Sequence, residues 1–123
     1  MSIFFNNVII EQEIQQTKNN DYSSLLERHP DKVLFYLIID KNIDHSIPQK
    51  KFLVPKTYTF TYFIQKIRKF IHLRKDEGLF YLINNEVPLM SSNVNFIYYK
   101  YKNPNGLVYI IIFKETLFGK NIG

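Results

Sequence analysis

Val33-Leu34-Phe35-Tyr36-Leu37-Ile38-Ile39 is an unbroken run of β-branched, aliphatic and aromatic residues, and it decides the fold. A continuous apolar run bounded by polar residues is typical of a central strand that is buried on both faces. A second run of this kind lies near the end of the chain, at residues 107–113. We therefore expect these two strands to form a parallel pair at the centre of a sheet.

A shorter strand is predicted at Phe52-Leu53-Val54, where Pro55 stops it. A short strand flanked by lysines and proline belongs at a sheet edge, because proline cannot donate a hydrogen bond to a neighbouring strand. The residues that follow have helical spacing, and Thr59 is the predicted cap. The apolar positions of this helix are Phe60, Phe63, Ile64, Ile67, Phe70 and Ile71, while Lys66, Arg68 and Lys69 fall on its outer side.

The remaining segments complete an α+β pattern, because strands and helices mix without strict alternation. Two short helices are predicted before Pro30, with Asp21 or Ser23 as a cap. Residues 40–49 read as a polar connection, residues 79–83 as a strand, residues 93–101 as a helix, and residues from 114 onward as a tail. Turns are expected at Asn84-Asn85 and at residues 103–106. A central parallel pair with a long helix packed across the sheet is the ubiquitin-like arrangement.

The composition and charge of the chain limit its possible functions. A length of 123 residues suits one domain, and the absence of cysteine excludes disulfides and thiolate chemistry. The net charge is +5, and residues 50–75 hold eight basic residues and no acid, whereas residues 1–31 hold five acids and two bases. This asymmetry favours an acidic partner: nucleic acid, anionic lipid or an acidic peptide. No apolar run reaches the roughly 20 residues that span a bilayer, and the N-terminus lacks signal-peptide features, so we expect a soluble cytosolic protein.

The sequence offers no credible active site, and we expect neither an enzyme nor a cofactor. The few glycines form no phosphate-binding fingerprint. His29, His45 and His72 are far apart and make no metal-binding pair. Asp44-His45-Ser46 places triad residue types side by side in sequence, but a triad is a spatial arrangement, and a surface turn is the better interpretation.

Several segments, in the right order and spacing, give the chain a family resemblance over about residues 21–119. Lys50-Lys51-Phe52-Leu53-Val54-Pro55 is nearly identical to one of the family's strands, and Glu115-Thr116-Leu117-Phe118-Gly119 is similar to its Glu-x-x-aromatic-Gly terminus. Residues 28–33, 67–74, 79–85 and 106–109 are similar to further segments. The chain resembles the ubiquitin-like autophagy modifiers of the GABARAP-like family.

The resemblance implies a ubiquitin-like β-grasp core with two additional N-terminal helices. The expected parts are a helical extension at residues 1–31, the core at 32–114 and a flexible conjugation tail at 115–123. Gly119 would be joined to phosphatidylethanolamine, with Phe118 helping to register the tail. The implied partners are a processing cysteine protease, activating and conjugating enzymes, and the membrane lipid itself. The lipidated protein would lie on autophagosomal or other organelle membranes.

The resemblance also implies peptide docking at the edge strand. Cargo receptors and adaptors would bind there through an aromatic-x-x-aliphatic motif, which adds a strand to the sheet. Two pockets would accept the two apolar side chains of the motif. The first pocket would involve Asp21, Leu25, Leu34, Tyr36, Lys51, Leu53 and Leu107, and the second Phe52, Val54, Pro55, Tyr58 and Phe63.

Two other functions stay open. The chain could be a ubiquitin-fold adaptor that binds partners without being conjugated. Alternatively, a small basic nucleic-acid-binding domain could use the basic stretch with Tyr58, Tyr62 and Phe63. The aromatic residues of the helix fall on its apolar side, which is typical of core residues and not of base-stacking platforms.

Overall fold

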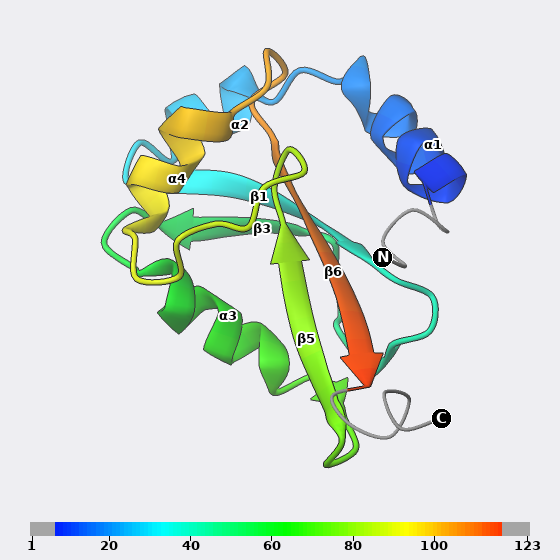
Figure 1. Ribbon diagram of the computed structural model, residues 1–123. Helices are drawn as coiled ribbons and strands as arrows, with labels where there is room; N and C mark the ends of the chain where they lie inside the picture. The colour runs from blue at the N-terminus through cyan, green and yellow to red at the C-terminus, as the bar shows by residue number, and fades with distance from the viewer. Residues whose placement is uncertain (1–6, 117–123) are drawn as a thin grey trace.

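The central feature is a four-stranded sheet in the order β3-β1-β6-β5 (Figure 1). The computed structural model describes residues 7–116, with side chains over residues 12–115. The two long apolar strands lie side by side in the middle and run parallel, with Phe35 opposite Val108, as the sequence predicts. The strands are β1 (Lys32–Ile39), β3 (Lys51–Pro55), β5 (Glu77–Leu82) and β6 (Val108–Thr116).

Helices cover both faces of this sheet, which explains the unbroken apolar run in β1. α3 (Phe60–Arg68) and α4 (Val94–Tyr101) pack against one face, where Phe35 is fully buried among Phe60, Phe63 and Tyr98. α1 (Asn7–Lys18) and α2 (Ser23–Arg28) supply residues to an apolar cluster on the other face. The two N-terminal helices and the mixed sheet confirm the predicted α+β, ubiquitin-like fold class.

Two helices begin where side-chain caps predict. The Thr59 hydroxyl accepts a hydrogen bond from the Tyr62 amide at 3.1 Å, which satisfies a free donor in the first turn of α3. Asn93 does the same for the Asn95 amide at 2.8 Å at the start of α4. For α2 the predicted cap is wrong: the capping position is Tyr22, without a side-chain bond, although the Asp21 carboxylate accepts from the Ser23 amide at 3.0 Å.

The predicted end of the long helix is also wrong. α3 ends at Arg68, and Ile71 belongs to a short strand, β4 (Ile71–His72), which pairs with β2 (Asp44–His45). The segment predicted as a polar connection thus contains a strand and the buried Ile43, and Asp44-His45 is not a simple surface turn. The helical spacing extends to Ile71 because that residue is buried, but it is buried as part of a strand.

The turns that were predicted from the sequence are present in the structure. Asn84 and Asn85 have φ values of 51° and 63°, which Asn tolerates better than other side chains do. Gly106 has a φ of 94° in the turn that leads into β6. β6 itself continues to Thr116, opposite Glu77, so the first two residues of the predicted flexible tail belong to the sheet. Within residues 7–116, no helix is both long and apolar enough to cross a bilayer.

Candidate peptide-docking site

The outer edge of β3 offers backbone groups to a further strand. Leu37 N donates to Lys50 O at 2.8 Å and Lys56 N donates to Asp31 O at 3.0 Å, which fixes the hydrogen-bonding register of β3 against β1. In an antiparallel pair, alternate residues turn their amide and carbonyl groups away from the partner strand. Lys51 and Leu53 therefore direct their backbone groups toward the open side.

Side chains already shape this edge. The Lys51 carbonyl accepts a hydrogen bond from the Gln49 side-chain amide at 2.8 Å, and the Pro55 carbonyl accepts from Tyr58 N at 3.1 Å. The Leu53 amide and carbonyl, with the Lys51 amide, are thus the groups best placed to pair with an added strand. A peptide bound here would extend the sheet, with β3 as its neighbour.

Most residues predicted for the first pocket come together in one apolar cluster on the α1 and α2 face. Leu34 and Leu107 are 1% and 0% exposed, so they form the floor of this cluster and not an open surface. Asp21 is exposed on the approach to α2, and Lys51 places its ammonium 5.1 Å from the ring centroid of Tyr22. The predicted members of the cluster are Leu25, Leu34, Tyr36, Leu53 and Leu107.

Side chains of α1 lie over this cluster and form hydrogen bonds with its tyrosines. The Tyr36 hydroxyl donates to Glu13 Oε2 at 3.0 Å, and the same carboxylate pairs with the Lys50 ammonium. Burial, together with the neighbouring Glu13 carboxylate, raises the pKa of Tyr36, so its hydroxyl remains a donor at physiological pH. Thr17 reinforces the contact through a 2.6 Å hydrogen bond to the Tyr109 hydroxyl.

The sequence interpretation missed the aromatic and α1 members of the first cluster. Tyr22, Ile38 and Tyr109 are buried in it, and Ile14 packs against it from α1. The alternation of β6 was the available signal, because Tyr109 lies two residues beyond Leu107 and so on the same face of the sheet. No feature of the sequence indicated that Glu13 of α1 would contact this cluster.

Four of the five residues predicted for the second pocket, all except Pro55, lie in or beside the main core on the α3 face of the sheet. The Phe52 and Phe63 rings meet edge to face with centroids 5.9 Å apart. Val54 and Phe63 are 2% and 3% exposed and belong to the main core, whereas Phe52 and Tyr58 are half-buried at its margin. Pro55 sits opposite Lys32 at the end of β3. The accessible part of this set is therefore Phe52, Pro55 and Tyr58.

The basic residues around α3 are exposed, as predicted, but the aromatic residues near them differ in their exposure to solvent. Lys66 and Arg68 on α3, and Lys69 just after it, all face solvent. Tyr62 is 46% exposed with the Lys66 ammonium 4.9 Å from its ring centroid, while Phe63 is buried. This division leaves a single exposed ring of the three proposed for base stacking.

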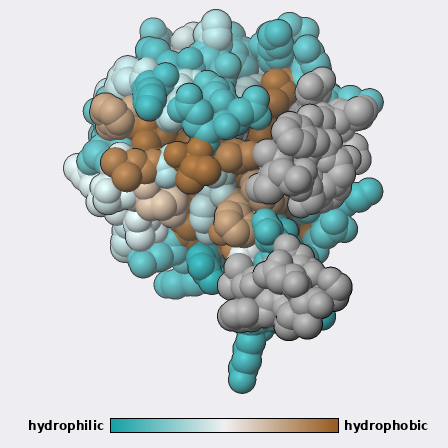
Figure 2. Space-filling model, in the orientation of Figure 1, coloured by the Kyte–Doolittle hydropathy of each residue, from teal (hydrophilic) through white to brown (hydrophobic). Residues whose placement is uncertain are grey.

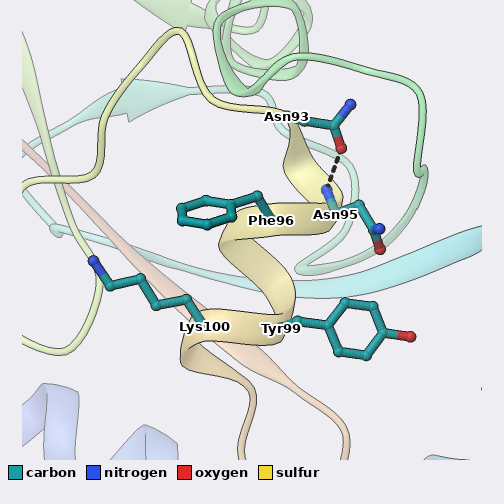
Figure 3. A pocket seen from close by; sticks show the side chains of 5 residues that line it. All are labelled: Asn93, Asn95, Phe96, Tyr99 and Lys100. Atoms are coloured by element: carbon teal, nitrogen blue, oxygen red, sulfur yellow. Dashed lines mark hydrogen bonds between the residues drawn. The ribbon is translucent and has the colours of Figure 1, made fainter.

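The structure also has hollows that the sequence interpretation did not anticipate. One, of about 630 Å³, lies on the outer face of α4 and is lined by Asn93, Asn95, Phe96, Tyr99 and Lys100 (Figure 3). Another, of about 370 Å³, lies between α2, the start of β1 and the end of α4. Among the residues that the structure describes, no three His, Asp or Glu side chains gather as a metal site. The predicted conjugation residues Phe118 and Gly119 lie outside the described part of the chain.

Comparisons with known proteins agree with this architecture. The family model described as "Autophagy protein Atg8 ubiquitin like" matches residues 16–119. The chain is also similar to the crystal structure of Trypanosoma brucei ATG8, with 33% sequence identity and a TM-score of 0.65. That match covers 79% of this chain and 84% of the other. The parallel β1–β6 pair, the two N-terminal helices and these matches together show that the chain belongs to the Atg8 family of ubiquitin-like autophagy proteins.

Proposed function

We propose that this protein is a ubiquitin-like modifier that is joined through Gly119 to phosphatidylethanolamine and recruits partners to autophagosomal or related membranes. The observation that carries the proposal is the family match, which ends at Gly119 while the chain continues for four more residues, Lys120-Asn121-Ile122-Gly123. Conjugation needs a free carboxylate on the reacting glycine. A cysteine protease would therefore cleave after Gly119, and Phe118 would help to register the tail in its cleft.

The chemistry would belong to other proteins. An activating enzyme and a conjugating enzyme would transfer the Gly119 carboxyl to the lipid amine, and this chain would act as the transferred group and not as an enzyme. Glycine suits that step because it has no side chain to obstruct a narrow active-site cleft. Two acyl chains on the attached lipid would anchor the protein far more firmly than one.

Recruitment would use the open edge of β3. An aromatic-x-x-aliphatic peptide from a cargo receptor or adaptor would pair with the outward backbone groups of Lys51 and Leu53. Lys51 and the exposed bases of α3 favour acidic residues next to that motif. Because Tyr36 fills the first cluster and Glu13 covers it, the peptide's apolar side chain would enter only after the α1 contacts shift.

Intact-mass analysis of the protein recovered from its own cells tests the conjugation. We expect a species that ends at Gly119 and carries the mass of phosphatidylethanolamine. Gly119→Ala should abolish both cleavage and lipid attachment, whereas the matched variant Gly123→Ala should leave both intact, since residue 123 would be removed. A lipid on Gly123, or on the Gly119→Ala protein, would overturn the assignment. Peptide binding without any lipid adduct would instead identify an unconjugated adaptor.

A further inference from the structure

The outer face of α4 carries exposed aromatic rings around its hollow. Phe96 and Tyr99 are 62% and 54% exposed, which is high for side chains of this size in a folded domain. Figure 3 shows Phe96 and Lys100 on one side of the helix and Asn95 and Tyr99 on the other. Hydrophobic side chains gather on this face, over α4 and the segment before it (Figure 2). The helix thus presents a shallow, open and partly apolar hollow.

The second hollow continues this surface, because Tyr99 lines both. Its other walls come from α2 and the start of β1, and its bases are Lys32, Lys56 and Lys102. The ammonium groups of Lys102 and Lys56 lie 4.8 and 5.8 Å from the centroid of the Tyr99 ring. Tyr99 therefore joins an apolar hollow to a cationic one.

The charge of this surface is largely uncompensated. Within the described residues, Lys56, Lys100 and Lys102 form no ion pair, and Lys32 pairs with Asp31 at 3.0 Å. Glu27 is the single acid that lines the second hollow. Unpaired lysines beside exposed rings are complementary to carboxylates that flank an apolar side chain.

We propose that the α4 face is a second docking surface, for an acidic peptide segment that inserts one apolar side chain between Phe96 and Tyr99. Its flanking carboxylates pair with Lys100 on one side and with Lys56 and Lys102 on the other. Asn93 and Asn95 line the same hollow, and because the Asn93 side-chain oxygen caps α4, their side-chain NH2 groups are the donors offered to the peptide backbone. The surface goes beyond the β3 edge, since none of the residues that line either hollow belongs to β3.

The shape of the surface favours a peptide over a membrane. A hollow of about 630 Å³ falls within the range of roughly 300–1,000 Å³ that is common for ligand pockets. A membrane would be contacted better by side chains that project outward from a convex surface. In this hollow the two rings lie on either side of a shallow depression, and a single side chain can lie between them.

The test uses the full chain and a short fluorescein-labelled peptide in which one Leu is flanked on both sides by Glu and Asp. This probe lacks the aromatic-x-x-aliphatic spacing, so the edge strand has no motif to select. Fluorescence anisotropy should show binding that weakens as salt rises. Phe96→Ser and Lys102→Glu should each reduce the affinity by about tenfold, because each removes a central contact. Lys102→Arg should retain binding, because it keeps the charge.

Tyr62→Ser and Lys66→Glu are the matched controls, because Tyr62 and Lys66 form a similar exposed ring-and-lysine pair on α3, with 4.9 Å between ammonium and centroid. These controls, and Leu53→Asp in β3, should leave binding of the probe unchanged. Equal losses in the α3 controls would overturn the proposal by showing a general charge effect. Loss with Leu53→Asp would assign the probe to the edge strand. Binding of phosphatidylserine vesicles but not of the peptide, with loss in Phe96→Ser, would replace the peptide with a membrane.

Discussion

Glu13 in α1 accepts a hydrogen bond from the hydroxyl of Tyr36 in the central strand β1, at 3.0 Å. The contact links the N-terminal helix to a residue that the family resemblance assigns to the first peptide pocket. Lys50, next to the edge strand, pairs with the same carboxylate. Through these two contacts, Glu13 of α1 connects Tyr36 in the apolar cluster to Lys50, which lies next to the edge strand β3.

Removal of the Tyr36 hydroxyl should loosen this contact. In Tyr36→Phe the ring still fills its place in the cluster, but Glu13 loses a hydrogen bond. We expect the free energy of unfolding to fall by about 1 kcal/mol. Urea denaturation measures the change, and Tyr99→Phe is the control, because Tyr99 is 54% exposed. Equal stability of Tyr36→Phe and the wild type would show that the Glu13 contact contributes nothing measurable.

Leu53→Asp should weaken docking at the edge strand. An acidic peptide with an aromatic-x-x-aliphatic core should bind the wild type with a Kd on the order of micromolar, near −8 kcal/mol. The aspartate would place an unpaired charge in the apolar groove, which costs free energy on binding. Isothermal titration calorimetry measures both affinities, with Thr57→Asp as an exposed control just beyond β3. Identical affinities for wild type and Leu53→Asp would exclude this edge as the binding site.

Glu77 should make stability depend on acid pH. Its carboxylate accepts from the Arg74 amide at 2.9 Å and meets the Lys114 ammonium at 3.0 Å, and these contacts hold the pKa of Glu77 below its usual value of 4.5. A lowered folded-state pKa stabilises the fold above the unfolded value, and this contribution is lost as the pH falls through the folded pKa.

The Glu77→Gln variant should therefore lose part of the stability difference between pH 6 and pH 3. Chemical denaturation at both pH values measures it. Asp44→Asn is the control, because Asp44 is exposed on β2. If Glu77→Gln kept the full pH dependence of the wild type, other carboxylates would have to account for it.

Gly106 should resist substitution. Its φ of 94° is poorly accessible to residues with a side chain, and an added Cβ would lie 2.9 Å from Leu26 Cδ1. We expect Gly106→Ala to reduce the free energy of unfolding by about 1–2 kcal/mol. Thermal unfolding tests this, with Gly78→Ala in β5 as the control, because Gly78 does not have a positive φ. A smaller loss at Gly106 than at Gly78 would contradict the conformational argument.

Elements whose sequence pattern has a local cause were predictable. The apolar runs of β1 and β6, the Thr59 cap and the Asn84-Asn85 turn each follow from the residues involved. The C-terminal end of α3 was not predictable, because the pairing of β4 with β2 is a contact between distant segments. The helical period alone could not distinguish a buried Ile71 in a helix from the same residue in a strand.

Part of the candidate site was likewise predictable from the sequence, and part was not. The edge position of β3 was readable from its length, lysines and proline, and the register confirms it. The contact between Tyr36 and Glu13 was not readable, because α1 shows only a few apolar positions and no mark of where it docks. The α4 hollow was missed because its exposed Phe96 and Tyr99 look, in sequence, like the apolar positions of an ordinary helix.

The position of β6 has a mechanical consequence. This strand is paired with β1 along its first part, Val108–Ile112, and with β5 along its last part, Ile111–Thr116, so two ladders hold it. A force that pulls on the chain beyond Thr116 along the strand acts on both ladders in shear. All of their hydrogen bonds must then yield together, whereas an edge strand can be peeled away one bond at a time. A tether attached beyond Thr116 would therefore pull on the element of the sheet that is best able to bear tension.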